Sequence, residues 1–276
     1  MRYKEIFLLK VLFLFYLMIF SPSFCLSETI KFSPLPHLPK EVLIGNYLPL
    51  IDLIKKKTGL PIELHYERDY QKMLADFKAG KIHIITAGPL PYVILKKDYP
   101  QAEAILHFKE KDGTAVYDCT LFTSHRGPDN VRRLKGPIAL PQKLSTCGYF
   151  SASIILSSEG KNLDKMGYTY FETHHEVAEA VIKGTHEAGC LKSDIAEQYR
   201  GFAIKFLKRS PKWPSFSIIV NTKILNPEQI KKIKLALINL EQEEAKNLVA
   251  GKHGFVEAKE KDFNIVKKYE RHFPKD

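Results

Sequence analysis

The chain has 276 residues, of which 45% are apolar, and a formal net charge of +11. This length and apolar content allow a proper core in one large or two small domains. The basic charge is spread along the chain without a dense arginine block or an RNA-binding signature, so we expect no nucleic-acid partner. The charge has three possible explanations: the protein binds anionic ligands, it binds a membrane surface, or its surface is simply lysine-rich and solvated.

The first 27 residues have the pattern of a secretory signal peptide. Arg2 and Lys4 give a positive start, and a mostly apolar run over residues 6–20 follows. An uncleaved membrane anchor is the alternative, against which the run is shorter than the roughly 20 residues that a spanning helix needs. We expect residues 1–27 to be removed by cleavage after Ser27, and the mature chain to be exported to the periplasm.

The first third of the mature chain alternates strands and helices, which predicts a mainly parallel sheet. Asp69 is a favoured helix N-cap, and Gly59 and Gly80 are helix stops. In chain order we expect a strand over 30–32, a Pro-rich loop over 34–39, a helix through 47–54, a strand over 60–66, a helix from 70 to Gly80, a strand over 82–86, a turn over 88–91 and a helix over 92–97.

The same unit recurs later in the chain. Residues 69–86 and 173–191 share one layout of cap, helix, glycine and strand, which predicts two similar α/β lobes. The expected elements of this part are a strand over 137–140, a helix over 149–156, a strand over 168–171, a helix over 174–183 and a strand over 187–191.

Two extended segments, Thr114–Thr123 and Ser217–Thr222, flank the second unit and are expected to cross between the lobes. A helix capped by Asn226 follows, and its apolar stripe predicts a return to the first lobe. The expected fold class is α/β, with two mainly parallel sheets flanked by helices and joined by two crossing strands. The lobe boundaries that follow are 28–116 with 217–276 for lobe 1, and 117–216 for lobe 2.

Such a two-lobed chain is typical of hinged proteins that bind a ligand in a cleft. In open α/β sheets, ligands bind outside the carboxyl ends of the strands. The segments at those ends are therefore expected to face one cleft; they are Tyr66–Tyr70, Thr86–Pro91, Ser145–Cys147, Thr173–Glu176 and Leu191–Asp194.

The segment Ser145–Tyr149 has the local design of an anion cradle. It joins an apolar strand to an apolar helical run, and its first three residues carry two hydroxyls and a thiol. The first N–H groups of a helix have no intrahelical partner and lie at the positive end of its dipole. We therefore expect this loop to hold an anion.

With these motifs in order, residues 30–270 resemble the phosphonate/phosphate/phosphite-type periplasmic substrate-binding proteins of ABC transporters, which have a type 2 periplasmic-binding-protein fold. The loop at 145–149 resembles the family pattern Ser-Thr-Ser-Gly-aromatic. The other matching pieces are Thr58-Gly59-Leu60, Asp69-Tyr70, Ala79-Gly80-Lys81-Ile82, Gly88-Pro89-Leu90, Asp112-Gly113 before Tyr117, His175-Glu176, Ser210-Pro211 and Pro214 before Ser217–Val220.

The resemblance implies a receptor that closes on a small tetrahedral oxyanion, without catalysis, cofactor or metal, and that works as a monomer. It implies a membrane partner, which is either the permease of an ABC transporter or the ectodomain of a sensor kinase. Hydroxyl and imidazole donors suit such an oxyanion. The implied ligand contacts are Tyr70, Tyr117, Ser145, Thr146, Cys147 and His175.

The chain departs from the family pattern at several of these positions. Cys147 replaces a serine, Pro91 stands where a small residue is usual, and Phe216 stands where binders of aminophosphonates tend to carry a carboxylate. Asp194 is a second candidate for such a carboxylate, whereas the neighbouring Lys192 favours an anion. An aminoalkylphosphonate ligand is therefore disfavoured.

Three cysteines remain after the predicted cleavage, namely Cys119, Cys147 and Cys190, so at least one has no partner within the chain. Three interpretations are open. Cys119 and Cys190 are buried apolar residues while Cys147 only replaces a serine; or Cys147 and Cys190 form a disulfide near the cleft; or Cys147 and Cys190 bind a soft ligand such as arsenite or Cu(I) in a thiol-based sensor.

Overall fold

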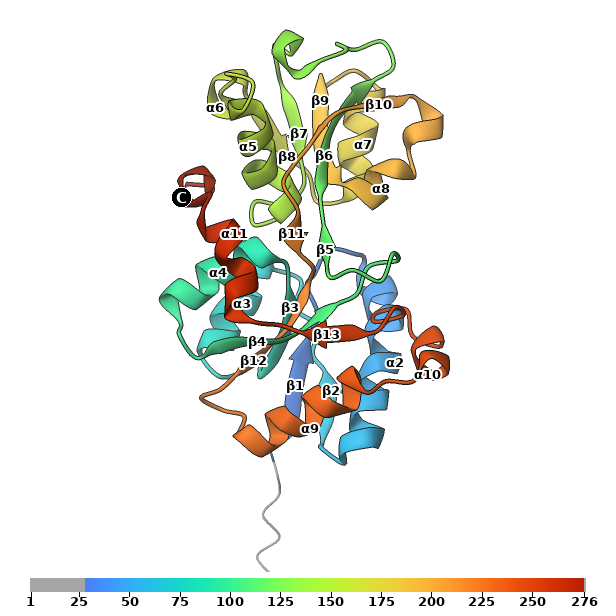
Figure 1. The fold of residues 1–276 in the computed structure, drawn as a ribbon, viewed down its shortest axis with the longest axis vertical. Helices are drawn as coiled ribbons and strands as arrows, with labels where there is room; N and C mark the ends of the chain where they lie inside the picture. Colours follow the sequence, from blue (N-terminus) through green and yellow to red (C-terminus); the bar gives the residue numbers. More distant parts are fainter. Residues whose placement is uncertain (1–27, 276) are drawn as a thin grey trace, which may run out of the picture.

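The computed structural model describes residues 28–275 and consists of two lobes, each a sheet flanked by helices (Figure 1). The predicted signal peptide lies outside the described residues. Within residues 28–275, no helix combines the length and the apolar character that crossing a bilayer requires.

The first lobe contains a six-stranded sheet in the order β13-β4-β12-β3-β1-β2. Its strands are β1 (Ile30–Ser33), β2 (Ile62–Leu64), β3 (Ile84–Ala87), β4 (Ala102–Phe108), β12 (Ser217–Asn221) and β13 (Phe255–Glu257). The helices of this lobe are α2 (Lys40–Thr58), α3 (Tyr70–Lys78), α4 (Pro89–Asp98), α9 (Pro227–Ile238) and α10 (Gln242–Lys246).

The second lobe contains a five-stranded sheet in the order β10-β6-β9-β7-β8. Its strands are β6 (Cys119–Ser124), β7 (Ile138–Leu140), β8 (Tyr168–Tyr170), β9 (Ala188–Lys192) and β10 (Ile204–Arg209). Its helices are α5 (Ser151–Ser157), α6 (Leu163–Met166), α7 (His174–Ile182) and α8 (Ser193–Glu197), with short turns at Val131–Arg133, Thr146–Phe150 and Arg200–Phe202.

The predicted α/β class is confirmed, but each sheet is mixed rather than mainly parallel. In the first sheet β1 is parallel to β2 and β3, whereas β12 is antiparallel to β3 and β4. In the second sheet β6 is likewise antiparallel to β9. The reason is topological, because β6 and β12 each follow a crossing from the other lobe and enter their sheets in the opposite direction.

The connection between the lobes is narrower than the sequence suggested. Of the expected crossing segments, 217–222 lies almost entirely in β12, and residues 119–123 of the segment 114–123 lie in β6. Only β5 of the segment 114–123 belongs to the crossing. The ribbon that joins the lobes consists of β5 (Val116–Tyr117) and β11 (Trp213–Pro214), which pair antiparallel. A two-stranded ribbon of this length is the natural place for a hinge, since few bonds hold it.

The C-terminal residues contact both lobes, which differs from their expected assignment to the first lobe alone. Glu260 accepts a hydrogen bond from the Tyr92 hydroxyl of α4 at 2.9 Å. Further on, the short helix α11 (Asn264–Lys267) lies along α4, and the chain ends near α5 (Figure 1). There the Phe273 ring lies 5.5 Å from that of Phe150, and His272 is hydrogen-bonded to Ser153 at 2.9 Å.

Two helix starts form as the sequence predicts. The Asp69 side chain accepts from the N–H of Lys72 and caps α3. Thr173 and Glu176 form a reciprocal capping box at the start of α7. Both caps matter for function, because the first residue of each helix lies beside the cavity described next.

Candidate ligand-binding site

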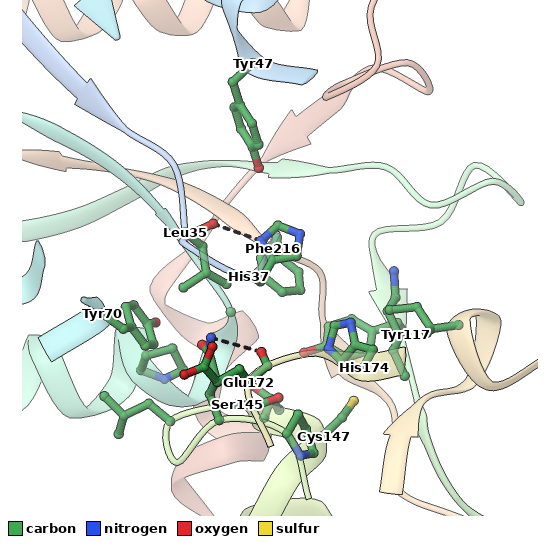
Figure 2. A pocket seen from close by; sticks show the side chains of 18 residues that line it. Leu35, His37, Tyr47, Tyr70, Tyr117, Ser145, Cys147, Glu172, His174 and Phe216 are labelled. Carbon is green, nitrogen blue, oxygen red and sulfur yellow. Dashed lines mark hydrogen bonds between the residues drawn. The ribbon is translucent and has the colours of Figure 1, made fainter. Parts of the chain in front are cut away.

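A cavity of about 220 Å³ lies between the lobes (Figure 2). Each of the five segments expected at the carboxyl ends of strands contributes to its wall, so that geometric prediction is confirmed. The residues from those segments are Tyr70, Gly88, Pro91, Ser145, Thr146, Cys147, His174 and Lys192. The wall is completed by Leu35, His37, Tyr47, Tyr117, Pro141, Gln142, Leu144, Glu172, Ile195 and Phe216.

The predicted anion loop occupies one wall of this cavity. Residues 146–150 form a wide helical turn that leads into α5, and Gly148 within it has a non-helical backbone. A Cβ on Gly148 would approach the Pro141 carbonyl oxygen to 3.2 Å, so the tight turn favours glycine. The N–H of Ser145 donates to the Gln142 carbonyl and that of Gly148 to the Ser145 carbonyl, so among the described residues the N–H groups of Thr146 and Cys147 are left without an acceptor. Ser145 and Thr146 add hydroxyls on the same wall.

The two lobes are hydrogen-bonded to each other across the cavity. The N–H of Leu90, at the start of α4, donates to the Thr146 hydroxyl at 3.2 Å. The Gln142 amide donates to the Pro36 carbonyl at 3.2 Å. Gly88 is required for this approach, because a Cβ there would lie 3.1 Å from the Thr146 Oγ1. The structure therefore has its cleft closed over the cavity.

Two predicted tyrosines lie on the cavity with their hydroxyls out of solvent. The Tyr70 hydroxyl is buried and has no hydrogen-bond partner among the described residues. Burial raises the pKa of Tyr70, and the nearby Tyr117 raises it further. Burial also raises the pKa of Tyr117. Both are thus neutral O–H donors near pH 7, and an unpaired buried donor is costly unless a ligand accepts from it.

An aromatic and basic cluster forms the wall beside Tyr117. The rings of Tyr117 and Phe216 are stacked with their centroids 6.1 Å apart. The Lys192 ammonium lies 5.1 Å from the Tyr117 centroid and 2.6 Å from a carboxylate oxygen of Glu110. Lys192 therefore brings a positive charge to the cavity, and its ion pair with Glu110, which does not line the cavity, fixes the position of the ammonium.

Two of the predicted contacts are not on the cavity. His174 lines it, whereas His175 is exposed and lies 3.4 Å from the Tyr199 hydroxyl. Consecutive residues of a helix point roughly 100° apart, so only one of this pair can face the cleft. Asp194 also lies outside the lining; its side chain is 61% exposed and pairs with Lys192 at 3.2 Å. The roles expected for His175 and Asp194 are therefore corrected.

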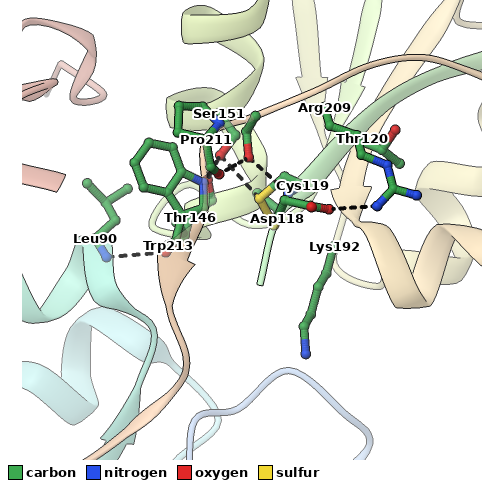
Figure 3. The surroundings of a disulfide bond; sticks show 12 residues. Leu90, Asp118, Cys119, Thr120, Thr146, Ser151, Lys192, Arg209, Pro211 and Trp213 are labelled. Carbon is green, nitrogen blue, oxygen red and sulfur yellow. Dashed lines mark hydrogen bonds and ion pairs between the residues drawn. A yellow bond between two sulfur atoms is a disulfide. The ribbon is translucent and has the colours of Figure 1, made fainter. Parts of the chain in front are cut away.

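Cys147 forms a disulfide with Cys119, and the Cα atoms are 5.2 Å apart (Figure 3). The predicted alternative, a bond between Cys147 and Cys190, is wrong. The disulfide fastens the anion loop to the start of β6, directly after the hinge ribbon. Ser151 strengthens the same junction, since its hydroxyl donates to the Thr146 carbonyl at 2.6 Å and accepts from the Trp213 indole at 3.1 Å.

This pairing also removes the basis of the thiol-sensor interpretation. Cys147 lines the cavity as half of a disulfide, which offers no thiolate to arsenite or Cu(I). Cys190 is the one free cysteine among the described residues, and it is fully buried in the second sheet. Burial raises its pKa far above the usual range for a thiol, so it is unreactive.

Sequence reasoning missed His37, which lies on the cavity opposite His174. It comes from the Pro-rich loop after β1, and its Nδ1 is hydrogen-bonded to the Leu35 carbonyl at 2.9 Å. The signal that could have found it is the same strand-end rule, because β1 is parallel to β2 and β3 and ends at the same edge. Burial lowers the pKa of His37, and burial together with His37 lowers the pKa of His174 to about 4.

The sequence matches the model of a known protein family. The sequence model of the family described as "ABC transporter, phosphonate, periplasmic substrate-binding protein" matches residues 32–263. The phosphate-import protein PhnD of Mycolicibacterium smegmatis is 26% identical over 141 residues, which are 48% of this chain and 43% of the relative. The chain thus matches less than half of the length of that relative.

Solved structures share the fold. PhnD1 of Prochlorococcus marinus, in complex with methylphosphonate, has a TM-score of 0.75 at 16% identity, over 88% of this chain and 97% of that one. A protein of Xanthomonas citri bound to ATP has a TM-score of 0.74 at 16% identity, over 89% of this chain and 99% of that one. With a family match that spans most of its length, the chain belongs to the periplasmic substrate-binding proteins of phosphonate ABC transporters.

Proposed function

We propose that this protein is an exported receptor that captures a phosphonate or a closely related small oxyanion between its lobes and delivers it to the permease of an ABC transporter. The observation that carries the proposal is the closed cavity in which the loop at 145–147 faces the buried and unpartnered hydroxyl of Tyr70. A tetrahedral oxyanion has the several acceptor oxygens that such converging donors need.

The distribution of charge supports an anion over a cation. Lys192 is a cation on the cavity wall, and tyrosine, serine and threonine side chains with hydroxyl donors line the same cavity. Glu172 also lines the cavity, but it is an exposed residue, and Glu110 is engaged by Lys192 and by the Ser215 hydroxyl. An anion therefore meets donors in the interior and carboxylates only at the margin.

Transport requires that the lobes separate and close again around the ligand. The lobes proposed from the sequence, 28–116 with 217–276 and 117–216, meet at the β5–β11 ribbon, which we propose as the hinge. The hydrogen bond from Leu90 to Thr146 must break when the cleft opens. We propose that the receptor acts as a monomer, that its leader at 1–27 directs it to the periplasm, and that binding involves no catalytic step.

Calorimetric titration tests the proposal. The protein exported from the full-length chain is titrated with methylphosphonate, phosphite, phosphate and sulfate. We expect binding of at least one phosphorus oxyanion with micromolar or better affinity, because several charge-assisted hydrogen bonds form in a cavity closed to water. Absence of heat with every phosphorus oxyanion, for a protein that is folded by circular dichroism, would contradict it.

The variant Ser145→Ala, which removes a cavity hydroxyl, is expected to weaken that binding about tenfold, since a hydrogen bond to a charged group contributes about 1.5–3 kcal/mol. Ser158→Ala is the matched control, because the Ser158 hydroxyl is bonded to the Ile155 carbonyl outside the cavity. It should leave the affinity unchanged.

A further inference from the structure

Two histidines face each other across the cleft from opposite lobes. His37 belongs to the loop between β1 and α2 of the first lobe, and His174 is the first residue of α7 in the second. Their ring centroids are 6.5 Å apart and both rings line the cavity (Figure 2). They meet only when the lobes are closed, so any group that bridges them stabilises the closed form.

Neither ring has an acidic partner on the cavity. His37 Nδ1 is bonded to the Leu35 carbonyl, so this nitrogen carries the hydrogen and Nε2 is left for a ligand. Among residues 28–275 no hydrogen bond is made by the His174 ring. Both side chains thus present unused polar atoms to the same cavity, whose volume of about 220 Å³ exceeds what a phosphate-sized ion fills.

The charged groups around the pair favour a negative ligand group. Lys192 approaches both rings and disfavours a positive charge on either. Asp194 opposes this effect at His174 but is largely exposed. Glu172 lines the cavity from an exposed position, and Glu110 is occupied by Lys192. An ammonium group at this place would face a lysine and no buried free carboxylate.

We propose that His37 and His174 form a second binding pole of the cleft, which bridges an acidic substituent of the ligand, and that this protein selects phosphonates that carry a carboxylate over those that carry an amine. The inference rests on the proposed function, because it takes for granted that the loop at 145–147 holds the phosphonate group. The further step concerns the rest of the ligand: the space and the donors beside His37 and His174 suit an acidic substituent.

Capture of such a ligand takes up a proton. The neutral His37 that donates to Leu35 offers only a lone pair at Nε2, which repels a carboxylate. A proton on Nε2 turns it into a charged donor, and the ligand carboxylate supplies the negative charge that stabilises this proton. Binding of the ligand carboxylate is therefore coupled to the uptake of one proton by His37 near pH 7.

Titration of the full protein with three phosphonates that differ in their substituent tests this pole. The probes are methylphosphonate, phosphonoacetate and 2-aminoethylphosphonate, each at pH 7. We expect phosphonoacetate to bind at least tenfold more tightly than methylphosphonate, and 2-aminoethylphosphonate to bind more weakly than either. Repeating the phosphonoacetate titration in HEPES and in Tris, which differ in ionisation enthalpy, is expected to reveal uptake of about one proton.

The variants His37→Phe and His174→Phe keep a ring of similar size but remove the donors. Each is expected to abolish the preference for phosphonoacetate over methylphosphonate, and His37→Phe also abolishes the proton uptake. His175→Phe, on the adjacent exposed residue, is the matched control and should retain both.

The inference is overturned if 2-aminoethylphosphonate binds more tightly than phosphonoacetate, or if the preference survives in both cavity variants. The wild-type comparison stands even where a variant fails to fold. Failure of all three probes to bind would instead contradict the proposed function.

Discussion

The backbone N–H of Leu90 donates to the Thr146 hydroxyl across 3.2 Å, and these residues belong to opposite lobes. Pro89 and Pro91 have no N–H, so Leu90 carries the only N–H within residues 89–91. The start of α4 thus has little to offer an anion directly. It contributes instead by donating to the Thr146 hydroxyl, which lines the cavity.

Thr146→Val is therefore expected to weaken ligand binding tenfold or more and to favour the open cleft. The substitution keeps the shape of the side chain but leaves the Leu90 N–H without an acceptor, at a cost of about 1–3 kcal/mol in the closed form. Calorimetry measures the affinity, and small-angle scattering of the ligand-free protein should show a larger radius of gyration. Thr169→Val, on the exposed face of β8, is the control. Equal affinities for the two variants would contradict this role.

The disulfide between Cys119 and Cys147 closes a loop with a sequence separation of 28. Loss of such a crosslink is expected to lower the free energy of unfolding by about 3–4 kcal/mol. Chemical denaturation of Cys119→Ala/Cys147→Ala, with and without reductant, measures the loss, and reductant should affect the parent protein but not this double variant. Cys190→Ala is the control and should keep the sensitivity to reductant.

Alkylation tests the same pairing directly. Without reductant the denatured mature protein should expose one thiol, that of Cys190, and with reductant three. Modification of Cys119 in the unreduced protein would show that the pairing is incorrect.

The sequence predicted most of the elements because their signals are local. The caps at Asp69 and Thr173 depend on side chains within three residues, and both form as expected. β4 carries no such signal: its residues, Ala102–Phe108, include helix formers, and pairing with β12 and β13 decides its conformation. The mixed sheets also follow from the path of the whole chain and not from any window of it.

The site was predictable as a set of strand ends but not residue by residue. A shift of one position decides whether His174 or His175 faces the cavity, and the sequence has no signal for that rotation. His37 lies in a loop without periodicity. Cysteine pairing is likewise a three-dimensional property, since three cysteines allow three single bonds and spacing does not choose among them.

The stability of the ligand-free protein should fall as the pH drops from about 6.5 to 4. Burial lowers the pKa of His174 from 6.5 to about 4, so in this window the unfolded chain binds a proton that the folded protein excludes. The sign follows from linkage: the free energy of unfolding rises with pH wherever the unfolded state binds more protons. Above pH 6.5 neither state binds this proton, and the slope from His174 disappears.

His174→Gln should flatten this part of the profile by on the order of 2 kcal/mol between pH 6.5 and 4. Urea denaturation followed by the fluorescence of Trp213, the single tryptophan, measures it. Other buried histidines contribute to the absolute slope, so the difference between variants is the informative quantity. His175→Gln should follow the parent protein, and a parallel profile for His174→Gln would contradict the burial of its ring.

Tyr70→Phe is expected to separate stability from binding. The Tyr70 hydroxyl is buried and has no partner in the described part of the chain, so its removal should leave the free energy of unfolding unchanged or raise it by about 1 kcal/mol. The same substitution removes a donor to the oxyanion and should weaken binding about tenfold.

Tyr149→Phe is the control. The Tyr149 hydroxyl donates to an Asp164 carboxylate oxygen over 2.8 Å, and this pair lies outside the cavity. That variant should lose stability and keep its affinity. If Tyr70→Phe instead lowers stability and binds the ligand as the parent does, then Tyr70 is a structural residue and the oxyanion lies elsewhere in the cleft.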